Sequence, residues 1–520
     1  MAAMWRVGRL TGWCARTVTA TAVAIGAVAL PAVPSASATP GGEPTQVHAS
    51  PPVWTGCENW IGDTTGIPTA QCATVSVPVD WNDPNPQGPQ VQLAVIKIPA
   101  SGERIGALMV NPGGPGASAV DTVAGMGVAL ADTDLLRRFD LVGFDPRGIG
   151  HSTPELRCRT DAEFDAFRRG CSRRQAPAGV ARIEDLHRQF AQLCMNRMGA
   201  QFLANAGTVA TAHDMDAVRA ALGDDQINYL GFSYGTLLGA TYAQFYGDRI
   251  RAMVLDGPVD PAQDPIAKLV RQNGGFQKAF DEFAAQCAQS AGCPLGTDPA
   301  GFVNRYHQLV DPLVARPAYT SDPRGLSYPD AITGTGSALY GPRYWPYLTS
   351  GLLGLQRGTD AGDLLALADR YLHRDAQGHY TNQEDAATVV RCVDSVFPTD
   401  PAAWVEADRQ LREVAPAFSY GQFTGYAPRD TCALWPVPST PVPHPVSSPG
   451  PGKVVVVATT DDPATPYQSG VDLAGQLQAP LITFHGSQHT VVFNGDACVD
   501  TTVLAYLIDL RIPPAGVLCE

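Results

Sequence analysis

Short apolar runs alternate with amphipathic segments along much of the chain. Strand-like runs occupy residues 73–79, 91–98, 105–112, 139–148, 227–232, 250–257, 453–463 and 481–486. Apolar residues at helical spacing mark residues 211–222, 236–247, 468–477 and 501–510. This alternation predicts an α/β fold with a mostly parallel sheet that helices cover on both faces. The functional site of such a sheet is expected at the carboxyl ends of its strands.

The alternation stops between residues 258 and 452. This stretch holds helical patterns at residues 274–289 and 362–372, and it ends in a proline-rich exit. We interpret it as a large, mostly helical cap inserted into a sheet domain. That domain then consists of residues 39–257 and 453–520, and no internal repeat is evident.

The first 38 residues differ from the rest of the chain. Arginines at positions 6, 9 and 16 precede or open a short apolar stretch, and small residues at 36–38 offer a cleavage site. A transmembrane anchor needs about 20 apolar residues, and this run is shorter and is ended by prolines. The pattern predicts a secretory signal and therefore a secreted protein with no stable membrane insertion.

Cysteine usage agrees with export. Apart from Cys14 in the predicted leader, eleven cysteines remain, and an oxidising compartment would pair most of them. Their spacing matches no zinc-ligand pattern, so no metal is expected. Pairing near neighbours leaves Cys171 unpaired and predicts the bonds Cys57–Cys72, Cys158–Cys194, Cys287–Cys293, Cys392–Cys432 and Cys498–Cys519.

Composition narrows the class of protein. The 520 residues are 45% hydrophobic and 17% charged, which is enough to bury a large core. The net charge of −14 and the absence of a basic run argue against a nucleic-acid partner.

One serine stands between two glycines where an apolar run gives way to a helical pattern. Residues 231–235 read Gly-Phe-Ser-Tyr-Gly, with Ser233 at the centre. The pattern alone also fits a glycine-rich turn. In a strand-to-helix context, however, it is typical of a nucleophile elbow, where a sharp turn exposes the serine hydroxyl. Such a hydroxyl needs a base that an acid orients.

The base and the acid are expected from loops after later strands, in the order Ser, Asp, His. Asp462 lies just past residues 454–460 of the strand-like run that starts at residue 453, and His489 follows the run at 481–486. The 27 residues between them fit a loop, a helix and the next strand. Both side chains are therefore expected at the same edge of the sheet as Ser233.

Each position has alternatives. Asp461 adjoins Asp462, but the Asp-Pro-Ala-Thr-Pro run makes Asp462 the residue fixed by a rigid turn. Asp145 precedes the serine, and we expect it to brace a loop through Arg147. His485 lies within or at the end of its strand, where a packed imidazole is expected. The histidines that lack the required order or location are His151, His213 and His444.

An acyl-transfer site also needs backbone N–H groups aimed at the developing oxyanion. One donor is expected from Tyr234, directly after the serine, and another from the glycine-rich loop 111–116. The same loop supports a different interpretation, because residues 114–119 match Gly-x-Gly-x-x-Ala of a dinucleotide site with Asp145 further on. That interpretation leaves Ser233 and its two partners unexplained. A third interpretation, a hydrolase fold kept only for binding, is weakened because no triad position is missing.

Six segments carry a family resemblance over nearly the whole chain after the leader: NPGGPGAS, FDPRGIGHS, INYLGFSYGT, MVLDGPVDP, DDPATPY and SQHT. They resemble secreted tripeptidyl-aminopeptidase-like serine hydrolases of actinobacteria, especially exported mycobacterial proteases, which are relatives of the proline iminopeptidases in the α/β-hydrolase fold. The resemblance implies a peptidase triad of Ser233, Asp462 and His489, with oxyanion donors Tyr234 and Gly114. The iminopeptidase loop begins His-Gly-Gly-Pro-Gly, whereas Pro112 stands here before Gly113.

The main functional hypothesis is an exported serine peptidase for short peptides or exposed segments, with no metal or organic cofactor. The alternatives are a carboxylesterase of the same fold and, more distantly, a dinucleotide-dependent oxidoreductase. An aminopeptidase would need a cap carboxylate to pair with the substrate's α-ammonium. Acids available in the cap include Asp281, Glu282 and Asp369.

Overall fold

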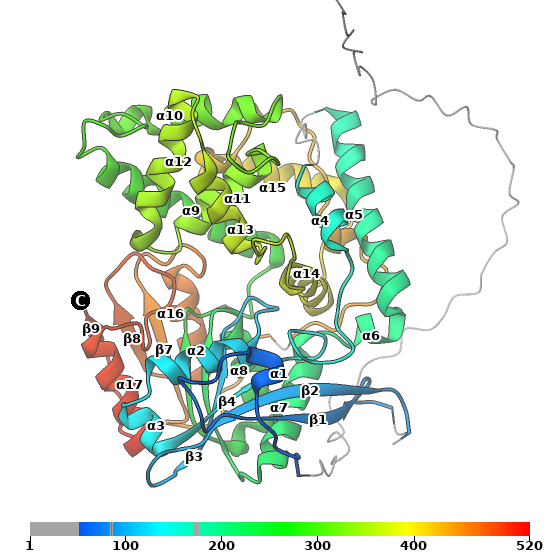
Figure 1. Ribbon diagram of the computed structural model, residues 1–520, viewed down its shortest axis with the longest axis vertical. Coiled ribbons are helices and arrows are strands. Elements are labelled where there is room, and N and C mark those ends of the chain that lie inside the picture. The colour runs from blue at the N-terminus through cyan, green and yellow to red at the C-terminus, as the bar shows by residue number, and fades with distance from the viewer. Residues whose placement is uncertain (1–50, 84, 86, 170–175, 443) are drawn as a thin grey trace, which may run out of the picture. The chain divides into compact units, whose positions relative to one another are not determined.

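The computed structural model describes residues 51–83, 85, 87–169, 176–442 and 444–520. The predicted leader and Cys171 lie outside these residues. Within them, the strands form one nine-stranded sheet in the order β1-β2-β4-β3-β5-β6-β7-β8-β9 (Figure 1). Strand β2 runs antiparallel to β1 and β4, and all pairs from β4 to β9 are parallel. The predicted mostly parallel sheet is confirmed.

The strands have the following bounds: β1 Gln71–Pro78, β2 Gln90–Ile98, β3 Gly106–Asn111, β4 Phe139–Phe144, β5 Ile227–Phe232, β6 Ile250–Asp256, β7 Val454–Thr459, β8 Leu481–Phe484 and β9 Val517–Cys519. Strands β3, β4 and β7 are buried along their whole length. Burial on both faces explains why these strands are continuous apolar runs rather than alternating ones. The short β9 carries too few residues for its pattern to be recognised in the sequence.

Helices cover both faces of the sheet. Apolar side chains of three helices pack on one face: α2 Ala119–Ala129, α3 Asp134–Arg138 and α17 Ala497–Asp509. A second cluster on the other face draws on α7 Thr208–Leu222, α8 Tyr234–Tyr246 and α16 Tyr467–Leu477. The short α1 spans Glu58–Ile61. Across the described ranges, no helix has the length and apolar character needed to cross a bilayer.

The cap layer is built from two separate stretches of chain (Figure 1). The larger stretch lies between β6 and β7 and contains α9 Pro265–Cys287, α10 Phe302–Val310, α11 Tyr328–Ala338, α12 Trp345–Arg357, α13 Gly362–Tyr371, α14 Gln383–Asp394 and α15 Pro401–Val414. The second stretch follows β4 and contains α4 Asp161–Arg168, α5 Pro177–Met198 and α6 Ala200–Ala204. A hydrophobic core separate from the two sheet clusters holds much of the larger stretch together.

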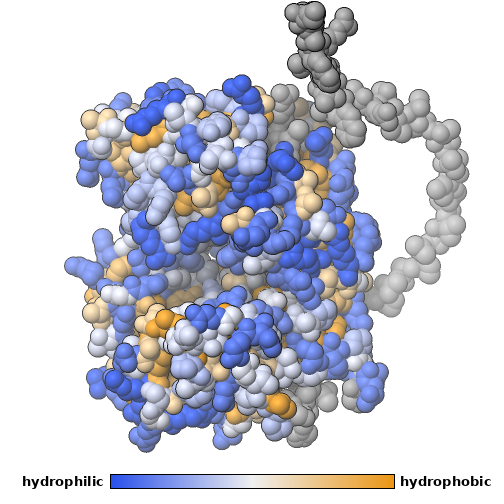
Figure 2. All heavy atoms as spheres, viewed as in Figure 1, coloured by the Kyte–Doolittle hydropathy of each residue, from blue (hydrophilic) through white to orange (hydrophobic). Residues whose placement is uncertain are grey.

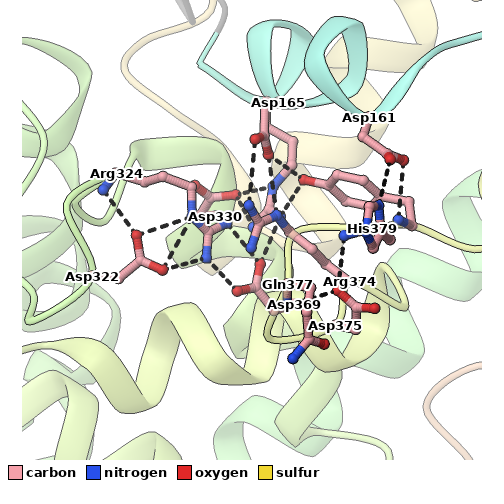
Figure 3. Close-up of polar contacts among 12 residues, drawn as sticks. Asp161, Asp165, Asp322, Arg324, Asp330, Asp369, Arg374, Asp375, Gln377 and His379 are labelled. Carbon is pink, nitrogen blue, oxygen red and sulfur yellow. Dashed lines mark hydrogen bonds and ion pairs between the residues drawn. The ribbon is translucent and has the colours of Figure 1, made fainter.

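Ion pairs tie α4 to the larger stretch (Figure 3). Arg168 of α4 lies 2.8 Å from Asp330 of α11 and 2.6 Å from Asp369 of α13. Arg324 also binds Asp369, at 2.5 Å. Arg374 binds Asp165 of α4 at 3.2 Å. The pairs of Arg168 and Arg374 join segments 162 to 209 residues apart in the sequence. Arg168 and Arg324 together occupy the carboxylate of Asp369 with two guanidinium groups.

Five disulfides match the pairs predicted from near neighbours: Cys57–Cys72, Cys158–Cys194, Cys287–Cys293, Cys392–Cys432 and Cys498–Cys519. The last of these connects α17 to β9 at the edge of the sheet. The bond from Cys392 to Cys432 fastens α14 to the chain that leads back towards β7.

A buried ion pair fixes the loop after β4. Arg147 is 2% exposed, and its guanidinium lies 2.5 Å from Asp214, which is completely buried in α7. The same guanidinium donates to the carbonyls of Val79 and Asn205. The expectation that Asp145 braces a loop through Arg147 is therefore wrong, because Arg147 pairs with Asp214. Asp145 instead accepts hydrogen bonds from Ser118, Val120 and His151.

Replacing Arg147 by methionine should destabilise the fold by about 3–5 kcal/mol, because the buried carboxylate of Asp214 loses its cation. Urea unfolding measures the change. Arg137→Met is the control, because it removes the ion pair of Arg137 with Asp134, in which both partners are more than half exposed. This variant should change the free energy of unfolding by about 0–1 kcal/mol. Similar small losses in both variants would contradict the assigned importance of the buried pair.

Candidate active site

Ser233 lies at a sharp turn between β5 and α8. Its backbone has φ 55° and ψ −122°, a conformation that residues other than glycine rarely adopt. The N–H of Ser233 donates to the carbonyl of Asp256 at the end of β6, at 2.8 Å. The strained turn is the geometry that the sequence motif predicts for an exposed nucleophile.

The glycines on either side of Ser233 allow close backbone contact. A Cβ at Gly231 would lie 2.5 Å from the carbonyl oxygen of Gly235. A Cβ at Gly235 would lie 2.6 Å from the carbonyl oxygen of Asn111, at the end of β3. Because real Cβ atoms do not approach backbone this closely, both positions require glycine for the turn to form.

The loop after β3 faces the same turn. A Cβ at Gly113 would lie 2.9 Å from the Cβ of Ser233 and 3.0 Å from the backbone nitrogen of Tyr234. The N–H of Gly113 donates to the Asn111 side chain at 3.0 Å, so it is already engaged. Gly114 is exposed and lines a cavity of about 100 Å³ together with Ser233 and Tyr234. Tyr234 is the first residue of α8, where the N–H has no acceptor within the helix.

The predicted acid and base are hydrogen-bonded to each other. Nδ1 of His489 lies 2.9 Å from both carboxylate oxygens of Asp462. The turn after β7 fixes this carboxylate, because Oδ1 accepts the backbone N–H groups of Ala464 and Thr465 at 2.9 and 2.8 Å. Asp462 is 2% exposed. A buried carboxylate with several donors is well suited to hold an imidazole in one tautomer.

Asp256 connects the nucleophile turn to the histidine loop. Its carbonyl accepts the Ser233 N–H, and its carboxylate Oδ2 accepts the N–H groups of Val491 and Val492 at 2.8 Å each. The next residue is Gly257, and a Cβ at this position would lie 3.1 Å from Cε1 of His489. The two residues at the end of β6, Asp256 and Gly257, therefore contact both the Ser233 turn and the His489 loop.

The cap contacts the imidazole directly. The ring of Tyr340 lies 5.4 Å from the ring of His489 in an edge-to-face arrangement. The backbone carbonyl of Tyr340 also accepts the backbone N–H of His489 at 3.1 Å. The ring of Tyr340 is also 6.0 Å from the ring of Tyr371 in α13, measured between ring centres. The surface is hollowed between the cap helices and the sheet layer (Figure 2).

Two buried groups have shifted pKa values. Burial alone would lower the pKa of His489, but the charge and hydrogen bond of Asp462, with a further contribution from Asp256, raise it above its usual value. Burial raises the pKa of Asp256 to about 7, although the two N–H donors from the histidine loop oppose this shift. Oδ1 of Asp256 has no hydrogen-bond partner among the described residues.

The alternative acids and bases lie elsewhere. Asp461 is in contact with Lys278 of α9. Asp145 is fully buried and accepts from the Ser118 hydroxyl and from the N–H groups of Val120 and His151. A ribose could not reach Asp145, which removes the acid that the dinucleotide interpretation needs. His485 is exposed, so the expected packed imidazole is wrong.

The remaining histidines have structural partners. His151 contacts Asp121 at 3.1 Å, His213 contacts the Tyr246 hydroxyl at 2.7 Å, and His444 contacts the carbonyl of Val442 at 2.9 Å. In the described part of the chain, one group of possible metal ligands occurs, formed by Asp496, Cys498 and Cys519. Its two cysteines are joined in a disulfide and offer no thiolate.

The sequence did not single out Glu384, a half-buried carboxylate in the first turn of α14. The carbonyl of Gln383, one residue earlier, occupies the place that a Cβ on Gly116 would need, at 2.5 Å. Burial raises the pKa of Glu384 to about 7, and the more distant charge of Arg159 only partly opposes this. No sequence signal marks Glu384, because its position depends on how α14 packs against the loop after β3.

The acids named from the sequence differ in availability. Asp281 is exposed and accepts from Gln277 at 2.8 Å, while Asp369 is held by two arginines. Glu282 is half-buried on α9. Neither the spacing nor the composition of the cap distinguishes these acids from Glu384.

The fold and the site define a class of protein. Residues 106–496 match the family model described as alpha/beta hydrolase fold, and the chain belongs to this family. It is a serine hydrolase.

Three relatives place the chain within the family. It is 61% identical to carboxylesterase B of Mycobacterium tuberculosis over the whole of both chains. It is 51% identical to serine protease Hip1 of the same species, over 90% of this chain and 91% of the relative. It is 31% identical to the tripeptidyl aminopeptidase of Streptomyces lividans, over 86% and 83% of the two chains.

Replacing Gly113 by alanine should reduce kcat by about 100-fold or more, because the new Cβ would stand 2.5 Å from the carbonyl of Phe232 and displace the serine turn. Steady-state kinetics with a nitrophenyl ester measures the loss. Gly125→Ala is the matched control, since a Cβ there meets nothing within 4 Å. Full activity in Gly113→Ala would contradict the packing described for this turn.

The acid limb of kcat/KM should lie above pH 6.5, because a protonated His489 cannot accept the serine proton and its pKa is raised. Asp256→Asn removes the negative charge that Asp256 carries above its own pKa of about 7, and this charge favours the imidazolium. The limb should therefore move to lower pH by about half to one unit. An unchanged limb in a folded Asp256→Asn variant would show that Asp256 has no electrostatic effect on His489.

Proposed function

We propose that Ser233 is the nucleophile of this serine hydrolase, with His489 as its general base and Asp462 as the residue that orients the imidazole. The support is geometric: a strained serine turn, a bonded acid–imidazole pair, and one residue, Asp256, that binds both loops. The oxyanion would be stabilised by the N–H groups of Tyr234 and Gly114.

The proposed reaction has two halves. His489 accepts the proton of Ser233 as its hydroxyl oxygen attacks the substrate carbonyl, and the negative charge moves to the carbonyl oxygen. His489 then donates that proton to the leaving amine or alcohol as the tetrahedral intermediate collapses to an acyl-enzyme. A water molecule, which gives a proton to His489, then attacks the acyl-enzyme, and the collapse of the second intermediate releases the carboxylic acid and returns the proton to Ser233. Asp462 stays ionised throughout and stabilises the imidazolium.

The observation that favours peptides is the carboxylate of Glu384. It stands at the amino end of α14, beside the loop that carries Gly116, and no described cation lies within ion-pair distance of it. Burial of this carboxylate disfavours its charged form and raises its pKa. A substrate α-ammonium would supply the missing cation. We therefore propose an aminopeptidase in which Glu384 binds the free amino terminus.

The position of Glu384 suits removal of a short peptide rather than a single residue. Ring-to-ring steps of 5.4 and 6.0 Å lead from His489 through Tyr340 to Tyr371, and the charge of Glu384 acts on both tyrosines. An extended tripeptide spans roughly 10 Å. This distance supports a tripeptidyl type of cleavage.

Carboxylesterase activity is the second candidate, because a relative with 61% identity is named carboxylesterase B and the same acyl-transfer chemistry serves esters. Export belongs to the proposal as well. Five disulfides support an oxidising compartment, and the leader-like residues 1–38 support a route to it.

The deciding experiment compares a peptide series with free and acetylated amino termini, alongside a short-chain nitrophenyl ester. Wild type should cleave the free peptides, and acetylation should reduce kcat/KM roughly 10- to 100-fold by removing a charged hydrogen-bond partner. Glu384→Gln should lose this discrimination while keeping ester turnover, and Ser233→Ala should lose both activities.

Other results would contradict parts of the proposal. Equal cleavage of free and acetylated peptides would indicate an endopeptidase. Ester turnover without peptide cleavage would favour the carboxylesterase. An active Ser233→Ala variant would overturn the nucleophile. Glu282→Gln, at another cap acid, serves as the control for a general change in cap charge.

A further inference from the structure

The cavity beside Ser233 contains an unpaired cation. Lys268 lies in the first turn of α9 and lines the same cavity of about 100 Å³ as Ser233, Gly114 and Tyr234. Its side chain is open to solvent, and no carboxylate of the described residues lies within ion-pair distance of its ammonium group. Arg271, one turn later on the same helix, lines the cavity too but pairs with Asp472 at 3.1 Å.

The location of Lys268 is electrostatically unfavourable for the fold. The first turn of a helix carries partial positive charge, so a cation there is disfavoured. Desolvation by the protein atoms packed around its ammonium group lowers the pKa of Lys268, and the charge of Arg391 adds to this, while the charges of Asp394 and Asp260 oppose it. Asp394 already accepts from the hydroxyl and the N–H of Thr208, and Asp260 accepts from Gln476 at 2.8 Å.

The two unpaired charges lie near opposite ends of one helix. Glu384 is in the first turn of α14, and Asp394, whose charge acts on Lys268, is its last residue. Ten residues of helix span about 15 Å. The amino end of α14 packs on the loop after β3, while Asp394 at its other end is linked through Thr208 to the Tyr234 hydroxyl. The helix therefore runs past the serine turn.

We propose that Lys268 is a specificity-determining residue that binds a carboxylate of the substrate on the side of Ser233 away from Glu384. This inference rests on the proposed peptidase function and narrows its substrate class. An extended peptide of about five residues matches the roughly 15 Å of α14 between Glu384 and Asp394, the residue whose charge acts on Lys268. The favoured substrates are then short free peptides with both termini charged, the amino end at Glu384 and the carboxyl end at Lys268.

A carboxylate has two possible sources in such a substrate, the carboxyl terminus or an acidic side chain. The test uses one pentapeptide with a free amino terminus, made as the C-terminal acid and as the amide. A second pair carries Glu or Gln at the last residue of the amide. Binding to the inactive Ser233→Ala protein is measured by calorimetry, and kcat/KM is measured on the active enzyme.

The acid should bind roughly tenfold more tightly than the amide and should have a lower KM, since one charged hydrogen-bonded contact is lost in the amide. Lys268→Met should abolish this preference, Lys268→Arg should retain it, and Lys268→Glu should reverse it. Arg271→Met should keep the preference, because the charge of Arg271 is already paired.

The outcomes separate this inference from the proposed function. If peptides bind but are not cleaved, the peptidase proposal fails, while the binding preference still tests Lys268. An equal preference for the acid in wild type and Lys268→Met would overturn the inference. The inference would also be overturned if Lys268→Met had a lower melting temperature and lost the same factor of kcat/KM on all substrates, because this would indicate a structural role. If the enzyme prefers Glu over Gln in the amide pair but does not distinguish the C-terminal acid from the amide, Lys268 binds an acidic side chain. That result would contradict the assignment of Lys268 to the carboxyl terminus.

Discussion

Asp256 is the residue on which the arrangement of the site depends. Its carbonyl binds the N–H of Ser233, and its carboxylate binds the two N–H groups that follow His489. Both interactions come from one residue at the carboxyl end of β6, so strand pairing in the centre of the sheet fixes the relation between two loops that are far apart in the sequence. The buried second oxygen of the carboxylate has no hydrogen-bond partner among the described residues. A charged carboxylate is unfavourable in such a position, and its retention is consistent with a role in the site.

Backbone crowding is the second constraint around the serine. The ends of β3 and β5 approach so closely that Gly113, Gly231 and Gly235 have no room for a side chain. This packing holds Ser233 in a conformation that costs energy for a residue with a Cβ. The surrounding sheet supplies the rigidity that keeps the strained turn in place. The loop after β3 consequently presents Gly114, rather than the already bonded Gly113, to the cavity.

Much of the sheet and of the candidate triad follows from local patterns. Buried parallel strands are short apolar runs, and the active-site loops come directly after them, so Ser233, Asp462 and His489 could be recognised by position and order. Near-neighbour pairing also predicted the five disulfides. The partners of Arg147 and Asp145 were not predictable in this way, because they depend on how loops from β1, β4 and α7 meet. The same applies to α4 to α6, whose role in the cap depends on distant ion pairs such as Arg168 with Asp330.

The cap and the sheet contribute different parts of the chemistry. The sheet fixes the reacting groups within loops that tolerate little change. In the proposed function the cap supplies the charges that face a substrate, and its helices are held by ion pairs and their own hydrophobic core. Several cap carboxylates and guanidinium groups neutralise each other, as Asp369 does with two arginines. Among the described residues, Glu384 and Lys268 have no ion-pair partner. Because unpaired charges at partly buried positions lower stability, the proposed substrate, which carries the opposite charges, would account for both groups.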